Sequence, residues 1–357
     1  MKPIRMAVVG TGALGRHHAR ILSEMEGVTL VAVADSNPTA AAEVAARCHT
    51  EAVTDFHELV DRVDAAVIAV PTSAHLPVAS AFLSQGIDVL VEKPIALNLE
   101  QAEQLVELAE ANQCLLQVGH VERFNPALVA ARPHLSSPRY IRSERYSPYA
   151  FRSTDIGVVH DVMIHDLDLV LSVVSSRIER VEAFGISIMG GHEDCVQARL
   201  VFRDGCIADL SANRVSPVTR RDMQVWSAEG CAHLDFSARR AVLYQASPTL
   251  KYGVSPLERA REPGANLEQL RNEVFGTYIK VHEPTVTPRD QLTEELLAFT
   301  SSIRTRKTPV VSGADAAKAM AVAERIVEQV ATHAWDAVPD GLVGPFLHTT
   351  NPRKLAG

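Results

Sequence analysis

The chain has 357 residues, a length that suggests two domains or one large one. Hydrophobic residues make up 46% of the sequence and charged residues 22%, so the chain can bury a sizeable core. The formal net charge of -8 argues against general nucleic-acid binding, and no apolar run reaches the length of about 18 residues that a membrane helix needs.

The sequence shows no signal-peptide pattern, and its cysteines form no C-x-x-C pair. We expect free thiols in a reducing compartment at Cys48, Cys114, Cys195, Cys206 and Cys231. The expected protein is therefore cytoplasmic, binds neither nucleic acid nor a membrane, and holds no metal.

Residues 1–120 alternate short apolar runs with helix-compatible segments. The predicted strands are 5–9, 29–34, 65–69, 89–91 and 114–118, and the predicted helices are 16–25, 39–47, 74–85 and 99–112. Strands that are apolar throughout and separated by helices are typical of a parallel sheet covered on both faces. This pattern predicts an α/β domain with a doubly wound parallel sheet, whose ligands bind beyond the carboxyl ends of the strands.

The first predicted strand ends in a glycine-rich turn. Gly10, Gly12 and Gly15 have the spacing G-x-G-x-x-G, which in a strand–turn–helix context is typical of a dinucleotide site; an ordinary glycine-rich turn is the alternative. Asp35 ends the next apolar run, where a carboxylate binds the ribose hydroxyls of NAD and repels the extra phosphate of NADP. We therefore expect NAD as the cofactor. The other expected contacts of this turn are Thr11, Ala13 and Leu14.

Two further strand ends carry polar or special residues. Pro71, Thr72 and His75 follow one apolar run, and Glu92, Lys93 and Pro94 follow another. All of these except Pro94 are expected beside the cofactor. A lysine at the end of a central strand is partly desolvated and could be held by its neighbouring glutamate; the alternative is an ordinary surface ion pair. The proline could supply a cis peptide bond.

After residue 120 the pattern changes to that of a second, α+β domain over 121–357. Helices are predicted at 123–131, 160–174, 289–303 and 313–331, and strands at 139–146, 181–188, 196–202, 207–212, 223–227, 232–236, 241–245 and 277–282. Asp204-Gly205 and Glu229-Gly230 predict hairpins and hence a largely antiparallel sheet. We expect a long loop at 247–267 and an irregular tail after Trp335.

The predicted helix 160–174 is apolar except for one stripe. Asp161, His165, Asp168 and Ser172 recur at the spacing of one helical face. Such a stripe on an otherwise buried helix faces either solvent or a site, and the residues alone leave both open. Asp161 lies one turn before His165 and can orient its imidazole and raise its basicity. Metal binding would need a further ligand at a suitable spacing, which we do not find.

Five motifs appear in order along the chain. They are Gly10-x-Gly12-x-x-Gly15, Pro71-Thr72-x-x-His75, Glu92-Lys93-Pro94, Arg123-Phe124 and Asp161-x-x-x-His165. Together they resemble the Gfo/Idh/MocA family of oxidoreductases. The resemblance implies an N-terminal Rossmann domain, a C-terminal domain with an open, mostly antiparallel sheet, and homo-oligomers (dimers or tetramers) formed through that sheet. It also implies that Lys93, Asp161 and His165 are the catalytic residues.

Three stretches, 118–126, 152–158 and 161–168, resemble the branch of this family that oxidises the 3-hydroxyl of UDP-N-acetylglucosamine and supplies amino sugars for lipid A. A UDP-sugar carries a pyrophosphate, which needs cationic partners. The expected substrate-binding residues are Arg123, Arg145, Arg152, Asp168 and Arg214, although arginines at a protein surface are common without such a role. A dehydrogenase of a free polyol or sugar and a dinucleotide-sensing regulator without catalysis are the alternatives.

Oxidation of a secondary alcohol transfers a hydride to the nicotinamide and a proton to a base. His165 is the expected base, because an imidazole titrates near neutrality. Lys93 is expected to bind the same hydroxyl and stabilise the developing alkoxide. In the alternative mechanism Lys93 itself takes the proton.

Overall fold

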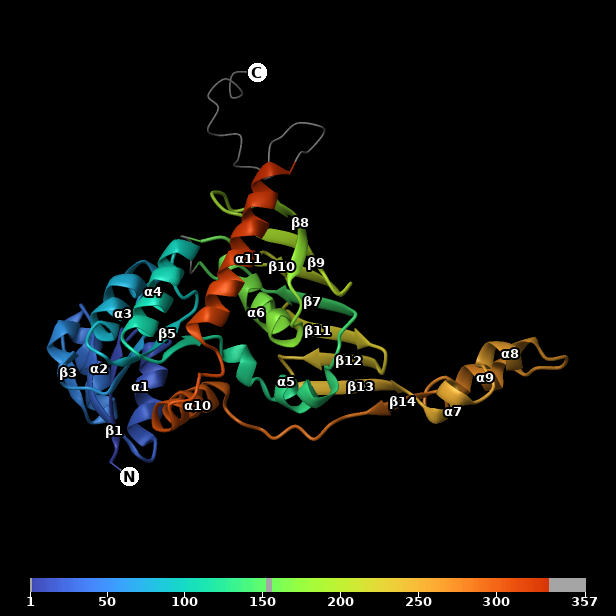
Figure 1. The fold of residues 1–357 in the computed structure, drawn as a ribbon, viewed down its shortest axis with the longest axis horizontal. Coiled ribbons are helices and arrows are strands. Elements are labelled where there is room, and N and C mark those ends of the chain that lie inside the picture. The colour runs from blue at the N-terminus through green and yellow to red at the C-terminus, as the bar shows by residue number, and fades with distance from the viewer. Residues whose placement is uncertain (1, 152–155, 334–357) are drawn as a thin grey trace, which may run out of the picture. The chain divides into compact units, whose positions relative to one another are not determined.

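The computed structural model describes residues 2–151 and 156–333 of the chain, which divides into two compact units (Figure 1). The first unit comprises Met1–Phe124 and Arg289–Arg325, and the second comprises Asn125–Pro288 and Ile326–Gly357. The expected tail after Trp335 lies outside the described residues, as does Arg152. The chain therefore leaves the first unit near the expected boundary and returns to it for 289–325.

The first unit contains a six-stranded sheet in the order β3-β2-β1-β4-β5-β6, and all its neighbouring strands pair in parallel. The strands are β1 (Ile4–Val9), β2 (Val28–Ala34), β3 (Glu51–Val53), β4 (Ala65–Ile68), β5 (Asp88–Glu92) and β6 (Leu116–Gly119). The helices are α1 (Gly15–Glu24), α2 (Pro38–Cys48), α3 (His75–Leu83), α4 (Leu99–Ala111), α10 (Gln291–Thr305) and the first part of α11 (Gly313–Thr332). The predicted doubly wound sheet is confirmed. The edge strand β3 was missed, since three residues with a single buried side chain give no periodic signal.

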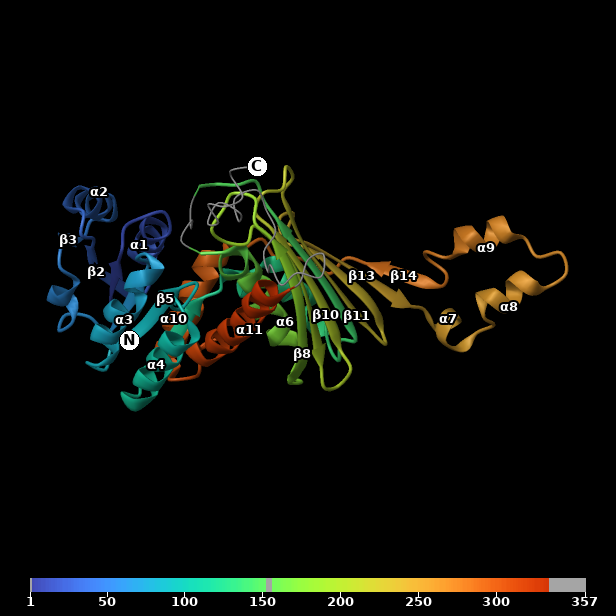
Figure 2. The same cartoon turned by 90° about the horizontal axis from the view of Figure 1, so that it is seen from above.

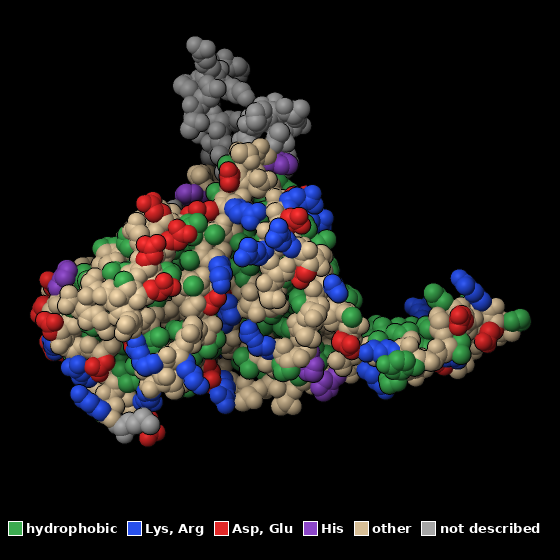
Figure 3. All heavy atoms as spheres, in the orientation of Figure 1, with side chains coloured by type: hydrophobic (Ala, Val, Ile, Leu, Met, Phe, Trp, Pro, Cys, Tyr) green, Lys and Arg blue, Asp and Glu red, His purple; other side chains and the backbone are tan. Residues whose placement is uncertain are grey.

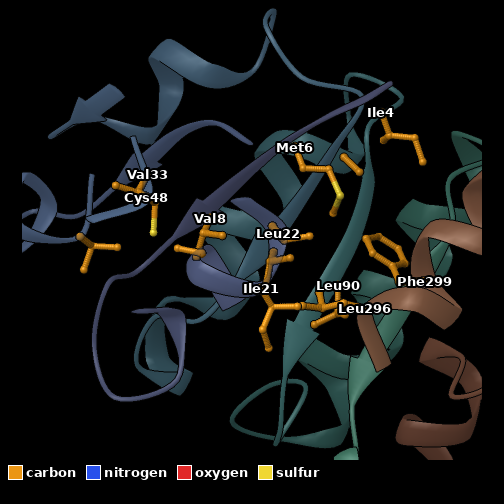
Figure 4. Close-up of a cluster of buried hydrophobic side chains, with 14 of the residues drawn as sticks. Ile4, Met6, Val8, Ile21, Leu22, Val33, Cys48, Leu90, Leu296 and Phe299 are labelled. Atoms are coloured by element: carbon orange, nitrogen blue, oxygen red, sulfur yellow. The ribbon is translucent and has the colours of Figure 1, made fainter. Parts of the chain in front are cut away.

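The core of the first unit explains why the chain returns to it (Figure 4). Leu296 and Phe299 of α10 are fully buried in the same cluster as Met6 of β1, Leu22 of α1 and Leu90 of β5. Full burial of a leucine or phenylalanine side chain stabilises a fold by roughly 1.5–3 kcal/mol. Without α10, this part of the sheet would lose those contacts.

The second unit contains an eight-stranded sheet in the order β14-β13-β12-β11-β7-β10-β9-β8. The strands are β7 (Tyr140–Tyr146), β8 (Ile178–Ile186), β9 (Cys195–Phe202), β10 (Ile207–Asn213), β11 (Arg220–Ser227), β12 (Gly230–Asp235), β13 (Arg240–Ala246) and β14 (Ile279–His282). Strands β7 and β10 pair in parallel and the other neighbours antiparallel, which confirms the mostly antiparallel sheet. Both predicted hairpins form, with Gly205 at φ 85° and Gly230 at φ 137°.

The two faces of this sheet differ. On one face, α5 (Pro126–Ala131) packs against β12 and β13, and α6 (Ile164–Val173), labelled beside the strands in Figure 2, packs against β7 and β10. The other face, here called the open face, presents the side chains of Tyr140, Phe184, Trp226 and Tyr244, which line two hollows of about 510 and 660 Å³. Phe184, on the edge strand β8, and Trp226, on β11, are 42% and 46% exposed, so this face carries large uncovered aromatic side chains.

The expected loop at 247–267 is wrong, because the segment forms the short helices α7 (Pro248–Tyr252) and α8 (Pro256–Arg261), with α9 (Leu267–Glu273) following. Ser247, Ser255 and Asn266 cap these helices by accepting backbone N–H groups. The helices form an arm between β13 and β14 that buries none of their residues, and its surface mixes apolar and charged side chains (Figure 3).

The predicted helix at 123–131 is also interrupted. Val121–Phe124 forms a 3-10 turn, and α5 starts afresh because Asn125 accepts the N–H of Ala127 and Pro126 occupies the first turn. Among the described residues, no helix combines the length and the apolar character needed to cross a membrane.

Candidate active site

The glycine-rich turn after β1 has the geometry that its spacing predicts. Gly10 has φ 92°, and a Cβ atom there would lie 2.5 Å from the carbonyl oxygen of Ala69. A Cβ atom on Gly15 would lie 1.8 Å from the carbonyl oxygen of Gly10, so this residue must lack a side chain for α1 to pack. A Cβ atom on Gly12, in contrast, would meet nothing within 4 Å. Gly12 therefore leaves open space beside the start of α1, where helix N–H groups favour an anion.

A cavity of about 570 Å³ opens beyond the carboxyl ends of β1, β2 and β4, the region where doubly wound sheets bind their ligands. Gly10, Gly12, Asp35 and Pro71 line it, as the sequence predicts. The full lining is Val9, Gly10, Gly12, Ala34, Asp35, Ser36, Thr54, Asp55, Phe56, Ala69, Val70, Pro71, Ala74 and Val78. The cavity has the size and position of a dinucleotide site.

Asp35 is an ionised carboxylate in the wall of this cavity. It accepts hydrogen bonds from the N–H and the hydroxyl of Thr11, at 2.7 and 2.8 Å, and from the N–H of Asn37 at 2.9 Å. Partial burial opposes its charge, but these hydrogen bonds outweigh burial and lower the pKa of Asp35. The negative charge of Asp35 is thus maintained in the wall of the cavity.

A second carboxylate, not predicted from the sequence, lies in the same wall. Asp55 follows β3 and accepts hydrogen bonds from the backbone and the ring of His57. These bonds lower the pKa of Asp55. Because strand β3 itself was not recognised, no sequence signal placed Asp55 beside Asp35. The two acidic groups together make this part of the cavity wall negatively charged.

The next two strand ends are tied to each other. His75 is 1% exposed, and its ring nitrogens lie 2.9 Å from the carbonyl oxygens of Val70 and Pro94. Burial lowers the pKa of His75 despite these carbonyls. His75 thus holds the loop after β4 against the turn after β5. Thr72 starts the 3-10 turn that precedes α3.

Lys93 follows β5 directly and is half-buried. The peptide bond between Lys93 and Pro94 is cis. The side chain of Glu92 is engaged by other protein groups: its Oε1 lies 2.7 Å from His18 Nε2, and its Oε2 accepts the N–H of Lys93 at 3.3 Å. Glu92 therefore fixes the backbone from which the lysine extends.

The second unit supplies Asp161 and His165. The expected helix forms, but its first turn, Val159–Met163, is a π-helix with hydrogen bonds to the fifth residue, and regular α6 follows. Asp161 lies in the wide turn and His165 just after it, and both are half-buried, whereas Asp168 is 1% exposed. Single π turns inside helices are frequent at functional sites. The π turn changes the regular helical spacing that the sequence predicts between Asp161 and His165.

Two neighbouring acidic residues without a sequence signal lie here: Glu193 holds the start of this helix, and Asp194 holds a loop before β9. Glu193 Oε1 accepts the N–H of Val159 at 3.1 Å, and a Cβ atom on Gly157 would lie 1.9 Å from the same oxygen. Asp194 accepts the N–H groups of Ile188 and Met189, both at 2.7 Å. No local pattern connects residues 157–159 with 193, because the contact joins segments more than 30 residues apart.

The structure places two of the expected substrate arginines in buried ion pairs. Arg145 is 4% exposed and donates to both oxygens of Asp166, with Nη2 at 2.8 Å from Oδ1. Arg214 is 5% exposed and donates through Nε to Asp194 at 2.7 Å. A buried arginine with its own carboxylate is a weaker anion site than an arginine without one. Arg123, in the first unit, is 9% exposed.

Two family models match the chain. The model described as "Oxidoreductase family, NAD-binding Rossmann fold" matches residues 4–120, and the GFO/IDH/MocA C-terminal domain matches residues 128–233. Together they cover the sheet of the first unit and much of that of the second.

Several known proteins are similar to the chain. The UDP-N-acetylglucosamine 3-dehydrogenase of Acidithiobacillus ferrooxidans is 33% identical over 284 residues, which are 79% of this chain and 90% of that protein. A solved structure of that enzyme superposes with a TM-score of 0.80 and covers 92% of this chain and 98% of the other. The scyllo-inositol 2-dehydrogenase (NAD(+)) of Bacillus subtilis is 28% identical over 60% of this chain and 68% of its own length. A levoglucosan dehydrogenase in complex with NADH and levoglucosan shares the fold, with a TM-score of 0.78 over 95% of this chain and 100% of the other, at 17% identity.

Proposed function

The chain belongs to the Gfo/Idh/MocA family of oxidoreductases, which act on CH–OH groups with a nicotinamide dinucleotide, and from this premise we propose that it oxidises the 3-hydroxyl of UDP-N-acetylglucosamine with NAD. The observation that carries this substrate is the 33% identity to a UDP-N-acetylglucosamine 3-dehydrogenase over 90% of that enzyme. A similarity of this extent includes both units. The product would be a 3-keto sugar, a substrate for an aminotransferase.

Lys93, Asp161 and His165 form the proposed catalytic set. His165 takes the proton of the substrate hydroxyl, and Asp161 orients the imidazole. Lys93 donates a hydrogen bond to the same oxygen and stabilises the alkoxide as it forms. Bound NAD supplies the hydride acceptor. In the alternative assignment Lys93 takes the proton.

The remaining predicted residues are assigned to binding. Gly12 and the start of α1 receive the pyrophosphate of the cofactor, and Asp35 receives the ribose hydroxyls. Arg145 and Arg214 shape the substrate region through Asp166 and Asp194, which leaves Arg123 and Arg152 as the arginines proposed for the sugar nucleotide. The pairing of Arg145 and Arg214 with carboxylates favours a second candidate, a free polyol or sugar as substrate, as for the similar inositol dehydrogenase.

The decisive assay is NADH absorbance after purified protein is mixed with NAD and one sugar. UDP-N-acetylglucosamine is compared with myo-inositol and free N-acetylglucosamine. Reduction with the nucleotide sugar alone supports the proposal, and reduction with a free polyol alone replaces it by the second candidate. A 2-oxo acid is added in a parallel series to recycle any NADH that stays bound. No reduction in either series rejects both.

Asp35→Asn is expected to weaken the preference for NAD. The substitution keeps the shape of the side chain but removes the charge that would repel the phosphate of NADP. We expect the ratio of kcat/KM for NAD to that for NADP to fall about tenfold, equivalent to roughly 1.4 kcal/mol. Asp61→Asn, at an exposed aspartate outside the cavity, is the control. An unchanged ratio in Asp35→Asn would refute the assignment of this residue.

The proposed oligomer is a homo-oligomer that buries the open face. The exposed aromatic side chains and the hollows of the open face support this interface. Its ion pairs, such as Arg199 with Asp209, place a positive and a negative group side by side, so the arginine of one copy can face the aspartate of the other across a two-fold axis. Trp226→Glu is expected to shift the mass in light scattering towards the monomer. Val129→Glu, at a residue of α5 that is 57% exposed, should leave the mass unchanged. Equal masses for the wild type and both variants would contradict this interface.

A further inference from the structure

A cluster of three ionisable side chains lies inside the first unit, behind the turn that carries Lys93. His18 comes from α1, Glu92 from the end of β5 and Glu295 from α10, and all three are buried. Their side-chain nitrogen and oxygen atoms lie within 4.8 Å of one another. Neither the sequence motifs nor the proposed mechanism gives a role to His18 or Glu295.

Glu92 is the fixed member of this cluster. Its Oε1 lies 2.7 Å from Nε2 of His18, and its Oε2 accepts the N–H of Lys93. Gly119 is its partner on the neighbouring strand, where a Cβ atom would lie 2.8 Å from Oε2. The carboxylate therefore occupies a space left by a glycine and connects the cluster directly to the backbone of Lys93.

Glu295 is fully buried, and neither of its carboxyl oxygens has a hydrogen-bond partner among the described residues. The backbone carbonyl of Glu295 accepts a hydrogen bond from Nε2 of Gln117 at 3.1 Å, and this bond holds α10 in place. Burial, and then the negative charge of Glu92, raise the pKa of Glu295 well above its ordinary value of 4.5. Burial without a hydrogen-bond partner and the close approach of Glu92 thus both favour the protonated form of Glu295.

A divalent cation is the other chemistry that one histidine and two glutamates can support. The geometry favours a proton instead. His18 Nε2 and Glu92 Oε1 already bond to each other, and separations of up to 4.8 Å exceed the ~3.4 Å between ligand atoms that metal bonds of about 2.1 Å produce in a tetrahedral site. A metal would also require Glu295 to lose its proton.

We propose that Glu295 is a positioning residue for Lys93: its buried carboxyl group is the polar neighbour of Glu92, and Glu92 holds the backbone of Lys93. The carboxyl groups of Glu92 and Glu295 lie within 4.8 Å of each other. A small movement would bring them into direct contact, and one water molecule could also bridge them. The inference relies on the proposed function only for the catalytic role of Lys93.

The first test is the reactivity of Lys93 towards limiting acetic anhydride, read by mass spectrometry. In Glu295→Leu, Glu92 loses its polar neighbour, and its hold on the backbone of Lys93 weakens. The lysine side chain is then less firmly positioned. We expect its acetylation rate at pH 8 to rise at least about threefold, because a less ordered side chain reaches the reagent more often.

Matched variants and an internal reference complete this test. Glu295→Gln preserves a neutral polar group and should restore the wild-type rate. Glu294→Leu, at the preceding residue of α10, should have no effect, and Lys318, whose side chain is 70% exposed, should react equally in all proteins. An unchanged rate in Glu295→Leu overturns the proposal. So does a Gln variant that behaves like the Leu variant, because the ionised carboxylate would then be required.

The second test measures thermal stability against pH. The folded state retains the Glu295 proton that the unfolded chain releases above about pH 4.3, so this group makes the free energy of unfolding fall as pH rises. His18 and Glu92, the titratable groups that face Glu295, remain in Glu295→Gln. The Tm of Glu295→Gln minus that of the wild type should therefore increase from pH 5 to pH 8. A constant difference, or one equivalent of metal in the purified protein, overturns the assignment of a proton.

Neither test depends on turnover. If no sugar reduces NAD but Lys93 responds as expected, the proposed function fails and the positioning of Lys93 stands. If UDP-N-acetylglucosamine is oxidised but the acetylation rate of Lys93 does not change in Glu295→Leu, the proposed function stands and the positioning role of Glu295 fails. Where turnover is available, Glu295→Leu should lower kcat while the Kd for NAD and the Tm stay at their wild-type values. A parallel fall of kcat and Tm indicates a structural role only.

Discussion

His165→Ala and Lys93→Ala are each expected to lower kcat at least about a hundredfold, since removal of a general base or of its electrostatic partner typically costs 10² to 10⁴. His165 is proposed to accept the hydroxyl proton, and Lys93 to stabilise the alkoxide. Neither residue lies in the cavity beside Gly12 and Asp35, so the Kd for NAD, measured by NADH or protein fluorescence, should stay within about twofold.

Two exposed residues provide controls for these variants. His134→Ala and Lys318→Ala should keep full activity, because both side chains are exposed and neither belongs to the proposed site. The two catalytic variants also distinguish the assignments of the base. If His165 is the base, the acidic limb of the pH profile of kcat/KM disappears in His165→Ala; if Lys93 is the base, it persists there. Turnover unchanged in both would falsify the catalytic set.

Gly12→Val has the second large expected effect, on cofactor affinity. A Cβ atom at this position meets no protein atom within 4 Å, so the variant should fold with a Tm within about 2 °C of the wild type. Its side chain would fill the space that the pyrophosphate needs. Overpacking of this kind costs about 1–3 kcal/mol, which predicts a rise in the Kd for NAD of roughly tenfold to a hundredfold.

Gly15→Ala is the informative contrast, because a Cβ atom there would lie 1.8 Å from the carbonyl oxygen of Gly10. This variant should lose thermal stability as well as cofactor affinity. Calorimetric titration with NAD beside thermal denaturation separates the two cases. Wild-type affinity in Gly12→Val would mean that the dinucleotide does not approach this turn.

The sequence predicts those features that depend on neighbouring residues. The glycine spacing and the alternation of apolar runs with helices are local, and they identify the parallel sheet and the position of its cavity. The capping of α7 by Ser247 and of α8 by Ser255 is equally local, and it was overlooked because these segments have no apolar face. A helix that buries nothing leaves no periodic pattern.

The features that escaped prediction depend on contacts between distant segments. From the sequence, Arg145 and Arg214 are plausible anion-binding residues. The fold pairs them instead with Asp166 and Asp194, which lie far from them in the sequence. Glu295 looks like any charged residue of an amphipathic helix, and only the packing of α10 on the sheet places it beside Glu92. Sequence periodicity identifies a buried helix face but does not say which strands it will cover.

The return of residues 289–325 to the first unit has a consequence for how the protein is made. Synthesis from the N-terminus yields the six parallel strands early, but Leu296 and Phe299, which complete their core, only after the whole second sheet has been translated. During synthesis, Met6, Leu22 and Leu90 of the first unit therefore stay incompletely covered until α10 has been translated. Residues Asn125–Pro288 of the second unit separate the two segments of the first, so a fragment that ends at Phe124 lacks Leu296 and Phe299 of this core.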